Sequence, residues 1–203
     1  FEIINNEILK KPFAKNLKEK LFLILYRFVL GSAAKIIFNT AYQAGLYQKL
    51  FTQQVTSEKI TVIENPWQPA ARRKSPGSSG DFVYVGRFIG LKNLPRLIRA
   101  FAKVSTDKKL LLIGDGPQRQ ELEELAKREQ HKQIQIMAPI GREQVLDVLS
   151  QSYALIIPSL TELNPNAVLE ALSVGTPVLV TAENGLPDAI KSQLELFNPL
   201  DED

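Results

Sequence analysis

The chain has 203 residues, of which 44% are hydrophobic and 23% charged, a composition typical of a globular protein with a sizeable core. Its 25 lysines and arginines against 22 acidic residues give no support for a dedicated nucleic-acid-binding protein, and this mild basic excess is compatible with phosphate ligands or with a peripheral contact at a membrane surface. The absence of cysteine excludes disulfides and thiolate metal sites and fits a reducing, cytoplasmic compartment.

The first third of the chain predicts alternating helices and strands. The predicted elements are a helix at 12–30, a buried strand at 34–38, a helix at 41–51 and a strand at 60–63. The longest apolar run, 21–30, is about half a membrane span and contains Arg27, so it does not predict a transmembrane helix. We interpret residues 1–67 as the end of one domain, which contributes a partial βαβ unit.

Residues 68–80, QPAARRKSPGSSG, have the composition of a linker between domains. From 81 to 203, strongly apolar strands alternate with amphipathic helices, which predicts a parallel sheet with helices on both faces. The predicted strands are 82–86, 110–113, 134–137, 154–157, 178–180 and 195–197. The predicted helices are 95–104, 117–129, 143–150 and 165–174, with a short turn at 187–190. The fold class is therefore α/β, with a Rossmann-like domain at 81–203.

The stretch ALIIPSLTELNPNAVLEALSVGTPVL, residues 154–179, carries two candidate acids. Glu162 follows an apolar strand and a Pro-Ser turn, and Glu170 lies eight positions later in a helix that Asn164 would cap and Pro165 would begin. Ligands of open α/β sheets bind at the carboxyl ends of the strands, where a helix N-terminus offers N–H groups to an anion. Two acids on either side of an anion site suit a nucleotide sugar, which has hydroxyls at both ends and phosphates between.

Other loops carry weaker signals. Arg87 and Lys92 follow the first strand of the second domain, where two cations could neutralise a diphosphate, although charged loop residues commonly have no role. The GDGP sequence at 114–117 is by itself only a tight turn. Glutamates such as Glu170 commonly lie on solvated helix faces.

No Gly-x-Gly-x-x-Gly opens a βαβ unit, which excludes a dinucleotide cofactor, and His131 is expected to be solvent-exposed.

Three segments in this order resemble retaining GT-B glycosyltransferases of the group 1 (family 4) class. They are FVYVGRFIGLKNLPRLIRAF, LLLIGDGPQRQELEELAKRE and the Glu-x7-Glu stretch, and together they extend from about 81 to 198. The resemblance implies that Arg87 and Lys92 bind the donor diphosphate, that Glu170 binds the ribose and that Glu162 contacts the sugar near the reacting carbon. It thus implies Glu162, Arg87 and Lys92 as catalytic residues. The further donor-binding residues that it implies are Gly86, Gly114, Asp115, Gly116, Ala138, Ile140, Asn166 and Ala167.

The chain departs from the family pattern between the two glutamates. The family has Glu-Gly-Phe-Gly-Leu, whereas here Leu163 adds bulk and Pro165 removes a backbone donor, so the identity of the sugar stays open. Asn93 also stands where the family usually has glycine.

The resemblance implies transfer, with retention, from a UDP- or GDP-sugar to a hydroxyl of a glycan or lipid-linked acceptor, without a metal or other cofactor. A sugar-nucleotide-binding module without turnover is the alternative, which the altered 163–166 loop favours. The resemblance implies that the acceptor and the family's histidine belong to an N-terminal domain, of which we expect this chain, beginning at Phe1, to contain only the end, and we expect the second domain to be truncated at its C-terminus. We therefore expect these residues to bind a donor but to be incomplete for catalysis, in a cytoplasmic protein with peripheral contact at the inner membrane surface as an alternative.

Overall fold

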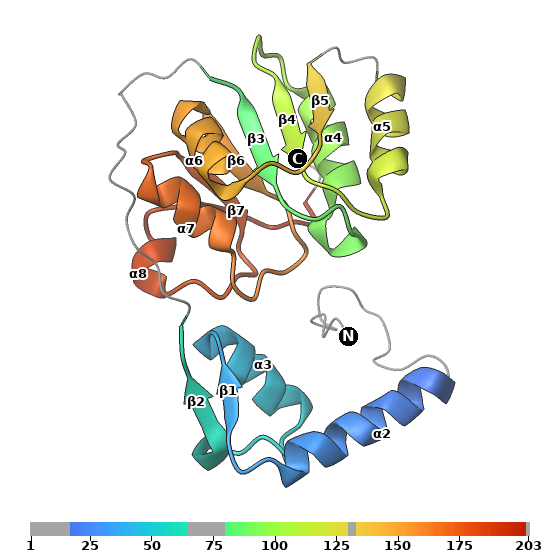
Figure 1. The fold of residues 1–203 in the computed structure, drawn as a ribbon, viewed down its shortest axis with the longest axis vertical. Helices are drawn as coiled ribbons and strands as arrows, with labels where there is room; N and C mark the ends of the chain where they lie inside the picture. The colour runs from blue at the N-terminus through green and yellow to red at the C-terminus, as the bar shows by residue number, and fades with distance from the viewer. Residues whose placement is uncertain (1–16, 65–79, 130–132, 202–203) are drawn as a thin grey trace. The chain divides into compact units, whose positions relative to one another are not determined.

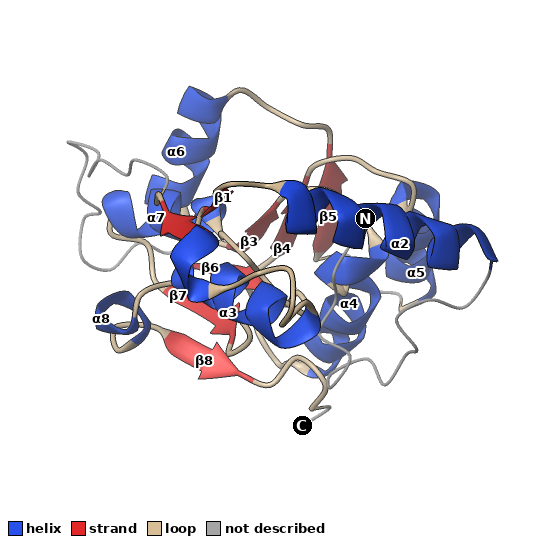
Figure 2. Ribbon diagram, turned by 90° about the horizontal axis from the view of Figure 1, so that it is seen from below, coloured by secondary structure: helices blue, strands red, loops and turns tan. Residues whose placement is uncertain are grey.

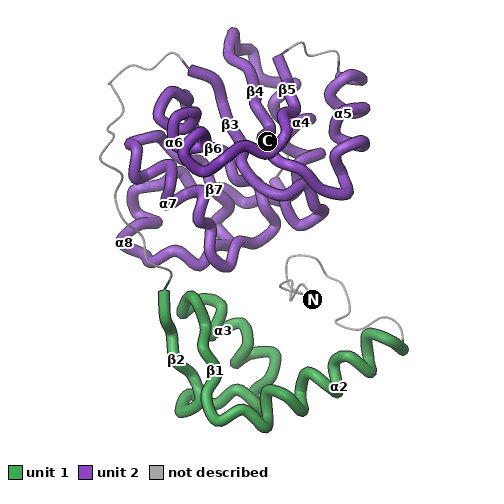
Figure 3. Tube along the Cα trace, in the orientation of Figure 1, with its two compact units in different colours: residues 1–66 green, residues 67–203 purple. Residues whose placement is uncertain are grey.

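The computed structural model describes residues 17–64, 80–129 and 133–201 (Figure 1). The chain divides into two compact units, residues 1–66 and 67–203 (Figure 3). The linker predicted at 68–80 lies outside the described residues except for Gly80, and His131 lies outside them too. Of the helices in the described part of the chain, none is both long enough and apolar enough to span a membrane.

The first unit is a βαβ segment preceded by a helix. Its elements are α2 (Leu17–Ser32), β1 (Ile36–Phe38), α3 (Ala41–Leu50), a 3-10 turn (Ser57–Lys59) and β2 (Ile60–Val62). The two strands pair in parallel with Ile36 opposite Ile60, which confirms the partial βαβ unit. Phe38 is buried but Ile37 is 62% exposed, so β1 is buried on one face only, whereas its apolar run had predicted a fully buried strand.

The second unit contains a six-stranded parallel sheet. Its strands are β3 (Phe82–Val85), β4 (Leu110–Ile113), β5 (Ile134–Met137), β6 (Ala154–Ile157), β7 (Val178–Thr181) and β8 (Glu195–Phe197). Its helical segments are a 3-10 turn (Gly90–Lys92), α4 (Leu94–Lys103), α5 (Arg119–Arg128), α6 (Arg142–Gln151), α7 (Asn166–Ser173) and α8 (Asp188–Lys191). The bounds of all six strands agree with the predicted ones to within one residue.

Helices cover both faces of this sheet, as predicted. The helix α4 packs beside α5, and α6 packs beside α7 (Figure 2). Right-handed crossovers explain this arrangement, because the chain moves across the sheet in one direction from β3 to β5 and in the other from β6 to β8. The strands are apolar because both faces are covered, and every residue of β6 is buried.

The strand order is β5-β4-β3-β6-β7-β8, which places the direction change between β3 and β6. Phe82 of β3 lies opposite Leu110 of β4 on one side and Ala154 of β6 on the other. The loops that leave the carboxyl ends of β3 and β6 therefore lead to helices on opposite faces. Doubly wound sheets bind their ligands at such a switch point.

Candidate functional site

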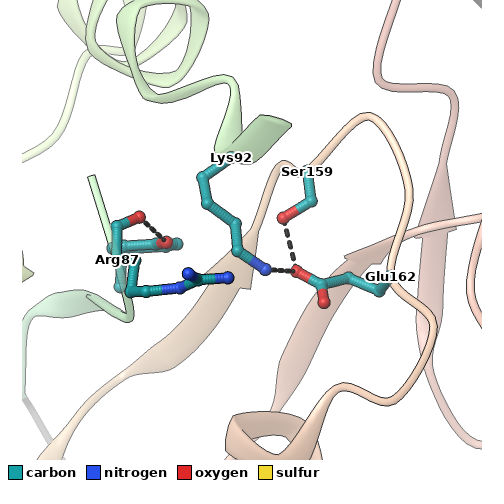
Figure 4. A network of polar contacts seen from close by, with 5 residues as sticks. Arg87, Lys92, Ser159 and Glu162 are labelled. Atoms are coloured by element: carbon teal, nitrogen blue, oxygen red, sulfur yellow. Dashed lines mark hydrogen bonds and ion pairs between the residues drawn. The ribbon is translucent and has the colours of Figure 1, made fainter. Parts of the chain in front are cut away.

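The loops after β3 and β6 bring a cation and an acid together although they lie 70 positions apart in the sequence. Lys92 Nζ lies 2.5 Å from Glu162 Oε1, and only 17% and 10% of these two side chains is exposed. The hydroxyl of Ser159 donates to the same carboxylate oxygen at 2.5 Å. Arg87 extends into the same region (Figure 4), and among the described residues its guanidinium has no carboxylate partner. The site therefore presents two cations beside one acid.

The main chain of Glu162 is fixed by the loop that follows β7. The Glu162 N–H donates to the Glu183 carbonyl at 2.8 Å, and the Glu162 carbonyl accepts from the Gly185 N–H at 2.8 Å. Asn184, between these two partners, is fully buried, and its side chain bonds main-chain groups on either side of it. The acid is therefore held on a rigid support, although it lies in a loop.

A buried tyrosine fixes the main chain of the loop after β3. Tyr84 is 1% exposed, and its hydroxyl donates to the Arg87 carbonyl at 3.1 Å. Burial, followed by the negative charge of Glu162, raises the pKa of Tyr84 far above its usual range, so the hydroxyl keeps its proton and remains a donor. Arg87 itself is exposed, which leaves its guanidinium accessible to a ligand.

A pocket of about 370 Å³ opens at the carboxyl ends of β3, β4 and β5. It contains five of the residues predicted to bind the donor, namely Gly86, Arg87, Gly114, Asp115 and Ile140. Ala138 is exposed and does not line the pocket, whereas the neighbouring Pro139 does. The lining is mostly apolar apart from Arg87 and Asp115, which suits the flat ring of a base.

The turn after β4 forms one wall of this pocket by pairing with the loop after β3. The Phe88 N–H donates to the Asp115 carbonyl at 2.8 Å, and the Gln118 N–H donates to the Phe88 carbonyl at 3.1 Å. The Asp115 carboxylate accepts from the Gly116 N–H at 2.8 Å. Gly116 therefore belongs to the turn that forms this wall but does not line the pocket itself.

Glu170 does not line the pocket but is held by an arginine from the neighbouring helix. Its Oε1 lies 3.1 Å from Nε of Arg142, whose side chain is 72% exposed. An exposed ion pair of this kind stabilises a protein by at most about 1 kcal/mol. A ligand hydroxyl can therefore displace Arg142 at little cost.

The helix α7 begins one residue later than predicted. Pro165, and not Asn164, occupies the N-cap position with φ −80° and ψ 78°. The Asn166 N–H donates to the Asn164 carbonyl at 3.0 Å, so this amide, which the sequence predicted to be available to the donor, is already engaged. Ala167 is the second residue of α7 and its side chain packs on the core of the unit.

Asn93 stands where the family usually has glycine, and its backbone conformation shows why an asparagine fits there. It is the only non-glycine residue in the described ranges with a positive φ, 55°, and asparagine tolerates this left-handed conformation better than most residues do. Its side chain donates to the Pro199 carbonyl at 3.0 Å, and Arg96 donates to the same oxygen at 2.9 Å. The turn that carries Lys92 is therefore tied to the residues after β8.

Sequence reasoning missed Ser159, Tyr84, Arg142 and the loop 183–185. Ser159 carried a detectable signal, because a serine that follows a buried strand and precedes an acid by three residues can reach that acid. The loop after β7 could also have been considered, because β7 ends at the same edge of the sheet. Tyr84 and Arg142 carried no such signal. In the described ranges no three His, Cys, Asp or Glu side chains cluster as metal ligands would, and metal independence remains a prediction.

Comparisons with known proteins agree with this geometry. The sequence profile of the family described as "Glycosyl transferases group 1" matches residues 68–198. Over 144 residues the chain is 29% identical to one of the subunits of the phosphatidylinositol N-acetylglucosaminyltransferase of Homo sapiens, a match that covers 68% of this chain and 30% of that protein.

Two solved structures show the same fold. Sucrose-phosphate synthase (tll1590) from Thermosynechococcus elongatus has a TM-score of 0.74 at 21% identity, over 90% of this chain and 50% of that one. Anabaena HepE in complex with UDP-glucose has a TM-score of 0.72 at 18% identity, over 90% of this chain and 55% of that one. The chain thus spans about a third of the human relative and about half of each solved structure. Because the family profile matches more than half of its residues, the chain belongs to the group 1 glycosyl transferases.

Proposed function

We propose that the second unit binds a nucleoside-diphosphate sugar and that the protein transfers this sugar, with retention, to a hydroxyl acceptor. The observation that carries the proposal is the convergence of Arg87, Lys92 and Glu162 at the switch point, beside a pocket large enough for a base. A diphosphate placed between the pocket and Glu162 would meet both cations. Fixed cations stabilise the charge that develops on a leaving diphosphate.

The comparisons support UDP rather than GDP as the nucleotide, because HepE, which shares the fold, was solved with UDP-glucose. The human relative is named for transfer to phosphatidylinositol, which supports a lipid-linked acceptor for this protein over a soluble glycan. A lipid-linked acceptor would bring the protein to the surface of a membrane.

A sugar-nucleotide-binding module without turnover is the second candidate. It is favoured by the loop between Glu162 and α7, where Pro165 has no N–H and the Asn166 N–H is engaged with Asn164. Fewer backbone donors then face the sugar than in the family pattern. A product assay on the full-length protein distinguishes the two candidates, because only the transferase consumes donor when an acceptor is present.

Calorimetric titration tests the binding site directly. We expect the 203-residue chain to bind UDP and a UDP-sugar, and to bind GDP and ADP more weakly. Arg87→Ala should weaken UDP, while the same substitution at Arg99, an exposed arginine on α4, should not. A chain that bound none of the three nucleotides would refute the donor site.

The two glutamates should act on different parts of the donor. Glu170→Gln is expected to weaken bare UDP and UDP-sugar about tenfold each, since a hydrogen bond to a charged group contributes about 1.5–3 kcal/mol. Glu162→Gln should weaken only the UDP-sugar. Titration of both variants with both ligands measures this, and Arg142→Ala serves as the control that breaks the Glu170 ion pair without removing the acid. Equal losses in all four titrations would contradict the division.

Donor binding is also expected to survive removal of divalent metal ions. Arg87 and Lys92 already supply positive charge at the switch point, so a bridging cation is not needed. The measurement is a titration of UDP-sugar in EDTA and then in excess magnesium or manganese. An affinity that rises more than tenfold with either metal would show that the two side chains do not neutralise the diphosphate.

A further inference from the structure

The carboxylate of Glu162 is constrained on one side only. Its Oε1 receives two hydrogen bonds, from Lys92 Nζ and from Ser159 Oγ, each 2.5 Å long. No described residue donates to its Oε2. With the main chain of Glu162 fixed by the loop after β7, the remaining freedom is rotation of the side chain, which the two bonds to Oε1 restrict.

The two donors differ in what they would do when a diphosphate arrives. Lys92 carries a charge that a diphosphate attracts strongly, so the ligand competes with Glu162 for the ammonium group. Ser159 is neutral and fully buried, so an incoming diphosphate has no charge on it to attract and does not compete for its hydroxyl as it does for the ammonium group. Ser159 is therefore the donor that remains on Oε1 in the occupied site.

We propose that Ser159 is a positioning residue, which holds Glu162 Oε1 so that Oε2 faces a hydroxyl of the donor sugar. A bond between a hydroxyl and a carboxylate is about twice as strong as one between neutral groups, and here it needs no rearrangement on binding. The inference rests on the proposed function, since it assigns Ser159 a part in recognising the sugar of a nucleoside-diphosphate sugar.

The test is a thermodynamic cycle on the 203-residue chain with UDP and UDP-glucose as the probes. Ser159→Ala is expected to weaken UDP-glucose about tenfold and UDP less than twofold, because only the sugar contacts Glu162. In a Glu162→Gln background the same substitution should change UDP-glucose affinity by less than twofold. A residue that served only to stabilise the fold would lower the affinity equally in both backgrounds.

A matched control is provided by Ser152, a serine at the end of α6 that is 3% exposed and donates to the Val148 carbonyl at 2.8 Å. Ser152→Ala should lower the melting temperature without changing the ratio of UDP-glucose to UDP affinity. Ser159→Cys fills the same space with a weaker donor, so an intermediate loss of about threefold is expected even if the alanine variant folds poorly.

The outcomes separate the two proposals. If the wild-type chain binds UDP and UDP-glucose but Ser159→Ala weakens both equally or neither, the positioning role is refuted and the donor site stands. If the wild-type chain binds UDP-glucose no more tightly than UDP, or binds neither, the role of Ser159 in recognising the sugar is refuted; the donor site itself is refuted only if UDP, GDP and ADP all fail to bind.

Discussion

Replacing Lys92 with alanine is expected to weaken nucleoside-diphosphate binding by about 10- to 100-fold, which corresponds to losing one charged hydrogen bond of about 1.5–3 kcal/mol. A second loss should appear in the free energy of unfolding. Glu162 is 8% exposed and would lose its cation, and an uncompensated buried charge costs about 3 kcal/mol. Calorimetry with UDP measures the first effect, and urea unfolding of the free chain measures the second.

Two comparisons separate these effects. Arg87→Ala should lower UDP affinity without lowering stability, because Arg87 is exposed and has no carboxylate partner among the described residues. Adding Glu162→Gln to Lys92→Ala should recover most of the lost stability, because the charge left without a partner is then gone. Lys103→Ala, which removes the same charge from the exposed end of α4, is the control for net charge. Unchanged stability in Lys92→Ala would mean that the ion pair is not formed in solution.

Gly114→Ala is expected to lower the free energy of unfolding by about 3–5 kcal/mol, because the new methyl group would overlap the main chain. Gly114 has φ +155°, and a Cβ placed on it would lie 1.9 Å from the Gly86 carbonyl oxygen. That oxygen belongs to the main chain, which cannot move without separating the loops after β3 and β4. The pocket between these loops would be lost together with the stability, so UDP binding should fall as well.

Gly90→Ala is the matched control, because a Cβ on Gly90 meets nothing within 4 Å and its φ is ordinary. Its free energy of unfolding should change by less than about 0.5 kcal/mol. Thermal and urea melts of the two variants make the comparison. A similar stability for both would show that the two loops do not approach each other as closely as the structure has them.

The secondary structure of the second unit could be predicted from sequence because its signals are local. Apolar runs such as 110–113 are bounded by polar residues, glycines or prolines, and they became strands with the predicted bounds. The start of α7 could not be placed to the residue, because Asn164 and Pro165 are both good candidates for its N-cap region and only the surrounding contacts decide between them.

The site could be predicted in part. That Lys92 and Glu162 share one edge of the sheet followed from their positions after strands. That they form an ion pair did not, because it depends on β6 lying next to β3 rather than beyond β5. The pairing of Glu170 with Arg142 likewise depends on α6 packing beside α7. Contacts of this kind are set by topology, which a pattern of apolar residues does not encode.

The place of β3 in the sheet has a consequence for how the unit assembles. On either side of the seam, the paired strands from β3 to β5 and from β6 to β8 follow one another in the chain. By contrast, Phe82 of β3 and Ala154 of β6 pair although three helices separate them in the sequence. Contacts so distant in sequence form slowly. The seam between the two halves is therefore expected to be the last part of the sheet to close. A ligand that bridges Lys92 and Glu162 spans that seam, so it should slow amide hydrogen exchange in β3 and β6 more than in the edge strands β5 and β8.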